Sequence, residues 1–213
     1  MATRIVAATK DHAEFIAWVS IAAARSHLPR GFWDFYIPDE RECTRYLTCL
    51  AATTTPHPFH HSVFLVAEVD GRPAAALCGF FEEENGFAQL GPVMAEVDRA
   101  LGRPQEAAQE GMARLGPFMT VTPEHAPRAW IVENVATLPE FRRRGLVSQL
   151  VGAALERGAA RGARVSEISV LIGNDAAQLA YEKAGYRVES EKRNPELERT
   201  WGSPGIRLLR REL

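Results

Sequence analysis

The sequence predicts an α/β fold, and three stretches carry that prediction. Residues 129–137 are rich in β-branched and aromatic side chains, and an apolar stripe at helical spacing follows over 146–155, so a buried strand leads into a helix. Residues 62–69 and 73–81 read as two strands joined by the dipeptide Asp-Gly, a strong hairpin turn signal. Because apolar residues occupy both faces of these two strands, we expect a sheet that is covered on both sides.

The first 52 residues predict one strand and two helices. Residues 4–8 form the strand, and Asp11 then acts as an N-cap, with Glu14 three residues later at capping-box spacing. The helix that follows is expected to reach about residue 25. The aromatic segment 30–38 is expected to be a loop, and a second helix then runs to about residue 52.

A histidine-containing segment, 53–61, separates the second helix from the hairpin. His57, His60 and His61 invite comparison with a metal site, but their spacing fits no compact ligand set and no acidic residue or cysteine lies near them. We therefore expect a solvated loop that holds no metal ion.

The segment 82–127 is less regular and rich in glycine and proline. One or two helices fit it, near 93–101 and 105–115. A segment of this length between two strands is usually functional, although a decoration with a packing role is an equal alternative. We expect it to be an insertion in a single domain that spans residues 1–213.

The C-terminal part predicts strands on either side of one short helix. Residues 164–171 are apolar with little interruption and form a strand. Asn174 or the residue after it caps a helix that ends at Gly185, a typical C′ glycine. Two last strands are expected at 187–191 and 206–211, joined by a polar loop.

Composition excludes several classes of protein. The net charge of -2 gives no reason to expect nucleic acid or an anionic membrane as a partner, and no apolar run approaches the roughly 20 residues of a membrane span. Cys43, Cys49 and Cys78 form neither a zinc spacing nor an even disulfide set. With no signal-peptide pattern at the start, a reducing cytoplasm is the expected location.

The turn between the central strand and its helix is unusually basic. Arg142, Arg143 and Arg144 precede Gly145 where acidic residues normally complement a helix N-terminus. Positive side chains at this end of a helix destabilise it. A bound phosphate would make them favourable, because the first N–H groups of the helix and the arginines can both reach it. We interpret this turn as a cradle for a pyrophosphate; the alternative is a solvated basic turn.

Two motifs resemble the GNAT acetyltransferases. Arg142-x-x-Gly145-x-Val147 resembles their motif A, Gln/Arg-x-x-Gly-x-Gly/Ala, which binds the pyrophosphate of acetyl-CoA; Val147 stands where the family usually has Gly or Ala. Residues 174–186 resemble motif B, and the matching residues are Asn174, Ala177, Tyr181, Glu182, Lys183, Gly185 and Tyr186. The resemblance covers about 129–191 and implies the GNAT fold, a mixed and mostly antiparallel sheet with helices on both faces.

Glu133 is the candidate general base. It is an acid within an apolar strand, where burial raises the pKa of a carboxyl group toward a useful range. Its position relative to Arg142 also matches a strand site at which the family places a catalytic His or Glu. The alternative is a structural carboxylate that pairs with an arginine.

The resemblance assigns the remaining roles. Tyr181 becomes the acid that protonates the departing thiolate, with a core tyrosine as the alternative. The backbone N–H of Val135 polarises the acetyl carbonyl. Asn174 holds the pantetheine arm or acts only as an N-cap. The full set expected to bind the cofactor is Val135, Ala136, Thr137, Arg142, Arg143, Arg144, Gly145, Leu146, Val147, Ser148, Asn174, Ala177 and Tyr181.

The predicted function is transfer of an acetyl group from acetyl-CoA to a primary amine of a small molecule or peptide. The alternative is a non-catalytic acyl-CoA sensor on the same fold. The sequence leaves the oligomeric state, a homodimer included, undecided. The amine pocket is weakly encoded, since its candidate residues are equally consistent with core packing or a solvated edge. Those candidates are Phe32, Trp33, Phe35 and Tyr36, with Glu82, Glu83 and Glu84 as groups that attract a cation.

Overall fold

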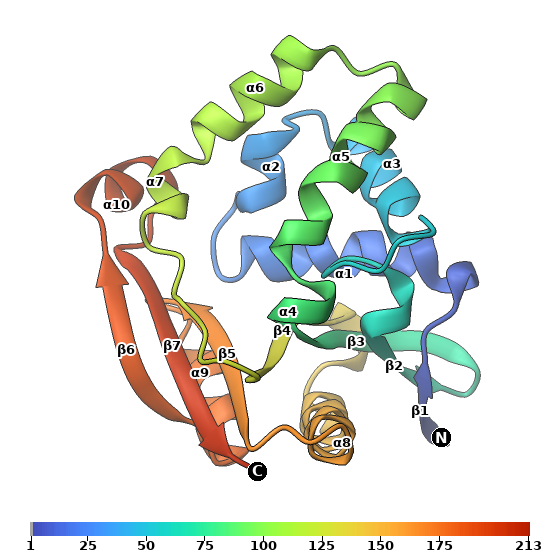
Figure 1. Cartoon of the computed structure of the whole chain (residues 1–213). Helices are drawn as coiled ribbons and strands as arrows, with labels where there is room; N and C mark the ends of the chain where they lie inside the picture. Colours follow the sequence, from blue (N-terminus) through green and yellow to red (C-terminus); the bar gives the residue numbers. More distant parts are fainter. Residues whose placement is uncertain (1) are drawn as a thin grey trace.

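The computed structural model describes residues 2–213, and the strands in them form one seven-stranded sheet (Figure 1). The strands are β1 (Thr3–Ala7), β2 (Phe64–Val69), β3 (Arg72–Phe81), β4 (Trp130–Thr137), β5 (Val165–Leu171), β6 (Arg187–Arg193) and β7 (Gly205–Glu212). Their order in the sheet is β1-β2-β3-β4-β5-β7-β6. All neighbours are antiparallel except β4 and β5, which are parallel, so the expected mixed and mostly antiparallel sheet is confirmed.

Helices cover both faces of this sheet, as expected. They are α1 (Ala13–Arg25), α2 (Phe32–Tyr36), α3 (Glu40–Ala51), α4 (Glu82–Asn85), α5 (Phe87–Leu101), α6 (Gln105–Arg114), α7 (Gly116–Met119), α8 (Leu146–Ala160), α9 (Asp175–Lys183) and α10 (Pro195–Trp201). Leu65 and Ala67 of β2 share a core with α8, whereas Phe64 and Val66 share one with α1 on the opposite face. Within the described residues, no helix has the length and hydrophobicity needed to cross a bilayer.

The segment between β3 and β4 contains more helix than expected. It forms α4 to α7, and Figure 1 shows α5 rising from α4 alongside α3, with α6 beyond α2, on the side of the sheet away from α8. Helix α5 begins at Phe87 and not near residue 93, because Pro92 lies inside the helix and does not start it. The segment therefore forms an extra helical layer over the N-terminal helices.

Arg103 fixes this layer to the rest of the molecule. Its side chain is only 4% exposed and donates a hydrogen bond to Asp98 at 3.1 Å. It also donates to the carbonyl oxygen of Tyr36 at 3.3 Å, and its guanidinium lies 4.7 Å from the centroid of the Tyr36 ring. A buried charge with these partners joins α2 to the loop between α5 and α6.

Removing this charge should destabilise the protein substantially. Arg103→Leu leaves the Asp98 carboxylate without this donor, whereas the Tyr36 carbonyl keeps its bond from Arg114, and breaking a buried ion pair in this way costs about 3 kcal/mol. We expect urea unfolding to show that loss. The control Arg41→Leu, at an exposed position on α3, should change the free energy of unfolding by less than about 0.5 kcal/mol. Equal effects of the two substitutions would contradict this role.

Two segments expected to be loops are short helices. Residues 32–36 form α2 because the Asp34 carboxylate accepts the Gly31 N–H at 2.8 Å and is itself held by Arg25 at 2.7 Å. The polar loop after β6 contains α10, in which Asn194 caps the helix by accepting from the N–H groups of Glu196 and Leu197. Both helices bury aromatic side chains, which the local sequence pattern does not reveal.

The N-cap expected at Asp11 is also wrong. Asp11 lies within a 3₁₀ turn, Lys10–His12, that precedes α1. The N-cap of this turn is Thr9, whose backbone N–H donates to His12 Nδ1 at 3.1 Å, and His12 occupies the N-cap position of α1 without a side-chain hydrogen bond to that helix. Thr9 and His12 thus form the capping box, two residues earlier in the chain than the predicted pair Asp11 and Glu14.

The histidine segment is not the solvated loop that the sequence predicts. His57 is fully buried and His60 is 5% exposed. The Nδ1 atom of His57 accepts the Phe59 N–H at 3.1 Å, so its Nε2–H donates to the Leu50 carbonyl at 3.2 Å. Among the described residues, no group of three or more acidic, histidine or cysteine side chains is placed to hold a metal ion. These histidines close the end of α3.

His57 should make the stability depend on pH. Burial, together with the neighbouring His60, lowers the pKa of His57 to about 4, from 6.5 in the unfolded chain. The unfolded state then binds more protons between those values, so stability falls as pH drops from 6.5 toward 4. The destabilisation caused by His57→Gln should shrink by about 2–3 kcal/mol between pH 7.5 and pH 4.5 in urea unfolding. A destabilisation by His57→Gln that is the same at both pH values would refute the assignment.

Candidate active site

The two parallel strands at the centre of the sheet separate after three residue pairs. β4 pairs with β5 only from Trp130 to Val132. On its other edge, β4 carries one residue more than β3 between the pairs Cys78–Glu133 and Ala76–Ala136, and Asn134 takes a positive φ of 53°. This bulge turns the strand, so β4 from Glu133 onward borders a gap on the β5 side.

A cavity of about 1000 Å³ lies at this gap. Its wall is formed by β4 and β5, by α1, α2 and α9, and by the segment between β3 and β4. The predicted site residues that line it are Glu133, Val135, Ala136, Thr137, Arg142, Val147, Asn174, Ala177 and Tyr181. Residues that lie far apart in the sequence therefore line the same cavity.

The other predicted residues lie around the start of α8. Arg143, Arg144 and Ser148 are exposed, Gly145 is the N-cap, and Leu146 points into the core with 2% of its surface exposed. The guanidinium of Arg144 lies 5.2 Å from the centroid of the Phe141 ring. Only the backbone N–H of Leu146 can serve a ligand, because its side chain is covered.

The start of α8 has the features of an anion site. Its first turn contains no acidic residue, and no side chain caps it. Gly145 has a φ of +74°, and a Cβ added to it would meet no protein atom within 4 Å. Gly145 thus needs a left-handed conformation and faces open space. The N–H groups in the first turn of α8, which follow it, have no side-chain cap. These features fit the diphosphate of a nucleotide cofactor.

Two hydroxyl groups in the cavity wall fit the polar arm of such a cofactor. Thr137 Oγ1 and Ser169 Oγ are buried and have no hydrogen-bond partner among the described residues. A buried hydroxyl without a partner is costly, and amide groups of a bound ligand would satisfy both. Ser169 was not predicted, since a serine alternating with apolar residues on β5 carries no signal of its own.

Glu133 lies in the cavity wall and is partly buried. Its burial is the main reason that its pKa rises to about 7, with Glu82 raising it further and His125 opposing the rise. A carboxyl group with this pKa is half ionised near neutral pH. It can therefore both accept and release a proton under physiological conditions.

Tyr181 reaches the same cavity from α9. The side chain is 7% exposed, and burial followed by the neighbouring Tyr186 raises the pKa of its phenol above the ordinary value. The phenol is therefore protonated at neutral pH and can donate to an anion. Asn174, at the N-cap of α9, accepts the Ala177 N–H at 3.2 Å and donates to Ser26 Oγ at 2.6 Å, which ties α9 to the loop after α1.

A buried ion network behind Glu133 was not predicted from the sequence. His125, which lines the cavity, lies with Nδ1 2.8 Å from the carboxylate of Glu167, a fully buried residue of β5. Arg210 of β7 donates two hydrogen bonds to the same carboxylate, at 3.0 and 2.8 Å. Burial opposes a charge on His125, but the bond to Glu167 raises the pKa of His125 above its ordinary value.

The aromatic residues of segment 30–38 divide between the cavity and the core. Phe32 and Trp33 line the cavity. Tyr36 is 1% exposed, and the Phe35 ring stacks on Trp201 at 4.3 Å, so these two serve packing. Among the three acidic residues of α4, Glu82 and Glu83 line the cavity. Glu84 does not, and instead forms ion pairs with Arg128 and Arg161.

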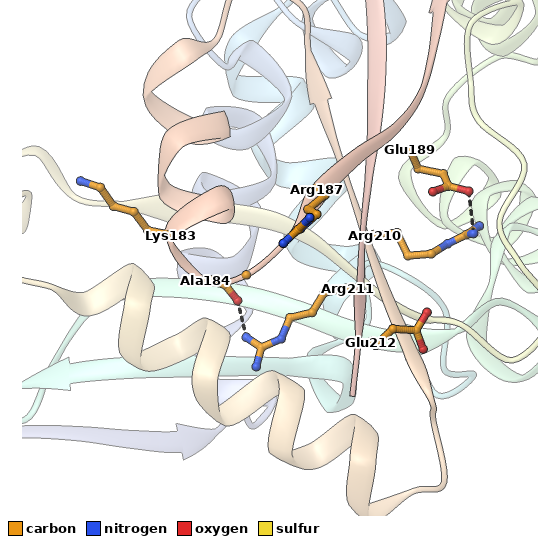
Figure 2. Close-up of a pocket in the computed structure, with 8 residues that line it drawn as sticks. Lys183, Ala184, Arg187, Glu189, Arg210, Arg211 and Glu212 are labelled. Atoms are coloured by element: carbon orange, nitrogen blue, oxygen red, sulfur yellow. Dashed lines mark hydrogen bonds and ion pairs between the residues drawn. The ribbon is translucent and has the colours of Figure 1, made fainter.

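A second cavity, of about 610 Å³, lies between α9 and the β6–β7 hairpin (Figure 2). Most of the side chains that line it are charged. Arg210 donates to Glu189 at 2.7 Å, and Arg211 donates to the carbonyl oxygen of Ala184. Because Arg210 also reaches Glu167, this surface supports the ion network behind the larger cavity and holds none of the predicted site residues.

Comparison with known proteins identifies the family. The model of the acetyltransferase (GNAT) family matches residues 26–186, and the protein belongs to this family. A search among curated proteins gives no match. Solved structures with the same fold include an acetyltransferase at a TM-score of 0.70 and 20% identity, covering 98% of both chains.

Two further solved structures share the fold over almost the whole chain. An N-acetyltransferase from Staphylococcus aureus Mu50 aligns with a TM-score of 0.66 and 16% identity over 98% of this chain and 100% of the other. The PaiA N-acetyltransferase from Thermoplasma acidophilum, solved in complex with coenzyme A, aligns with a TM-score of 0.57 and 10% identity over 100% of both chains. At these identities the likeness concerns the fold.

Proposed function

We propose that the protein transfers an acetyl group from acetyl-CoA to a primary amine. The observation that carries this proposal is that Glu133 and Tyr181, the proposed base and acid, line one cavity at the gap between β4 and β5, and that Val147 at the uncapped start of α8 lines it too. Membership of the GNAT family and the coenzyme A complex of one structural neighbour support it. We further propose that one domain does this, with residues 82–127 as an insertion that completes the cavity wall.

The start of α8 is where the cofactor would be held. The N–H groups of Leu146, Val147 and Ser148 would bind its diphosphate, and Arg142 and Arg143 would neutralise the charge. Thr137 and Ser169 would hold the pantetheine arm through their hydroxyl groups. Acetyl-CoA bound in this way supplies an acetyl thioester at the gap in the sheet.

The protein's own groups then move two protons. Glu133, as a carboxylate, takes a proton from the ammonium group of the acceptor, directly or through a water molecule, and the neutral nitrogen then bonds to the acetyl carbon. The Val135 N–H stabilises negative charge on the carbonyl oxygen. Tyr181 gives its phenolic proton to the thiolate that leaves when the carbon–sulfur bond breaks. The nitrogen loses its second proton to the Tyr181 phenolate, so the products are an N-acetyl amide, free CoA and the proton that Glu133 releases to solvent.

Two solution measurements test this function. Isothermal titration calorimetry should show saturable binding of CoA, and no heat at millimolar CoA would reject the proposal. Thiol release from acetyl-CoA in the presence of an amine panel should then show turnover, and Tyr181→Phe should lower its rate. Binding without turnover for any amine would favour a non-catalytic acyl-CoA sensor.

A further inference from the structure

We propose that the amine acceptor is a primary amine carried on an aromatic or similarly bulky apolar body without an acidic group. Glu82 would hold its ammonium group beside Glu133, and the aromatic wall of the cavity would hold its body. This inference rests on the proposed acetyl transfer and narrows the substrate class of that same site.

The part of the cavity away from α8 has a rigid aromatic wall. Phe32 meets Trp33 edge-on at 5.1 Å between ring centroids and meets Phe118 at 5.4 Å. Trp33 in turn meets Phe59 edge-on at 4.9 Å. All four rings line the cavity, so its shape is set by interlocked side chains from α2, the histidine segment and the segment between β3 and β4.

Apolar side chains at the same cavity also remain uncovered. Phe87 is 44% exposed and Met119 is 50% exposed, and both line the cavity. Together with the aromatic wall they give an apolar surface that water covers poorly. A ligand with an apolar body would bury this surface, whereas a polyamine would leave it exposed to water.

Acidic residues outnumber basic ones in the wall of the cavity. Glu82, Glu83, Glu124 and Glu133 line it, and among the described residues that do so the basic ones are His125 and Arg142. His125 donates from Nδ1 to Glu167, and Arg142 lies at the approach to α8. An acceptor with a carboxylate or phosphate would therefore meet like charges, while an ammonium group would be attracted.

Glu82 is the carboxylate best placed to receive that ammonium. Its Oε1 atom accepts the Phe87 N–H at 2.9 Å, which fixes the side chain. Its Oε2 atom is buried and has no hydrogen-bond partner among the described residues. An unpaired carboxylate oxygen in a cavity wall is costly, and a donor on a bound cation would remove that cost.

Three amines test the substrate class in the thiol-release assay. 2-Phenylethylamine has the aromatic body, phenylalanine adds a carboxylate to it, and 1,4-diaminobutane replaces it with a second cation. We expect kcat/KM for 2-phenylethylamine to exceed that of each of the others by at least about tenfold. A preference for phenylalanine or for 1,4-diaminobutane would overturn the inference and leave acetyl transfer intact.

Matched variants test the two contacts. Glu82→Gln keeps the oxygen that accepts from Phe87 and should raise KM for 2-phenylethylamine at least about tenfold with KM for acetyl-CoA unchanged. Glu84→Gln, outside the cavity, should leave KM for 2-phenylethylamine unchanged.

Met119→Ala should lower kcat/KM for this amine several-fold. Met112→Ala, equally exposed but outside the cavity, should leave it unchanged. The inference would be overturned if Glu82→Gln and Glu84→Gln had the same effect on KM, or if Met119→Ala and Met112→Ala had the same effect on kcat/KM.

Calorimetry separates failure of this inference from failure of the proposed function. 2-Phenylethylamine is titrated into the protein saturated with CoA. Binding that Glu82→Gln weakens, without turnover of any amine, would uphold the acceptor site and reject acetyl transfer. Turnover of other amines with no binding of 2-phenylethylamine would reject the acceptor class alone.

Discussion

Glu133→Gln should lower kcat by about 100-fold or more, because removing a general base usually costs 10²–10⁴ in rate. Glutamine keeps the size of the side chain but cannot accept a proton. In the unmodified protein the base works only when ionised, so kcat at saturating amine should rise with pH through a midpoint near 7, the raised pKa of this carboxyl group. The variant should lose that step in the profile.

The control for this substitution is Glu140→Gln, at an exposed residue in the turn before α8. It should leave both kcat and the pH profile unchanged. Circular dichroism should show that both variants keep their thermal unfolding midpoint within a few degrees. If Glu133→Gln retained kcat within about twofold, the carboxylate would be structural and the base would lie elsewhere.

Gly145→Asp should weaken CoA binding much more than Gly145→Asn does. Both substitutions place a side chain at a φ of +74° that meets no protein atom, and both residue types tolerate the left-handed region. The aspartate adds a carboxylate at the start of α8, where a diphosphate would sit. We expect its Kd for CoA, by calorimetry, to be at least about tenfold higher than that of the asparagine variant, owing to repulsion between like charges.

The same substitution separates binding from folding. A carboxylate at a helix N-terminus is favourable by about 0.3–1 kcal/mol, so Gly145→Asp should unfold no more easily than Gly145→Asn. A variant that folds as well but binds CoA less tightly would show that the anion occupies this turn. Equal Kd values for the two variants would place the diphosphate elsewhere.

The elements nearest the candidate site could be predicted from local sequence. The strand at 129–137 and the helix after Gly145 follow from β-branched residues giving way to helical spacing, and the structure has them as β4 and α8. Asn174 and Gly185 are standard ends of a helix, and the structure caps and ends α9 there. Each signal lies within one turn or one strand of the element that it defines.

The parts that could not be predicted depend on contacts between distant residues. His125 and Glu167 are 42 residues apart, and nothing near either one shows that they meet. Arg103 is 67 residues from the Tyr36 carbonyl that it binds. The burial of His57 likewise follows from the packing of a whole segment and not from its own polarity. Such residues acquire their environment only when the fold is complete.

The most direct test of the central claim is a crystal structure of the protein in complex with CoA. We expect the diphosphate oxygens at about 3 Å from the backbone N–H groups at the start of α8, with the thiol end in the gap between β4 and β5 beside Glu133 and Tyr181. A CoA molecule seated away from the Gly145 turn, or with its thiol outside the cavity between these two side chains, would contradict the account.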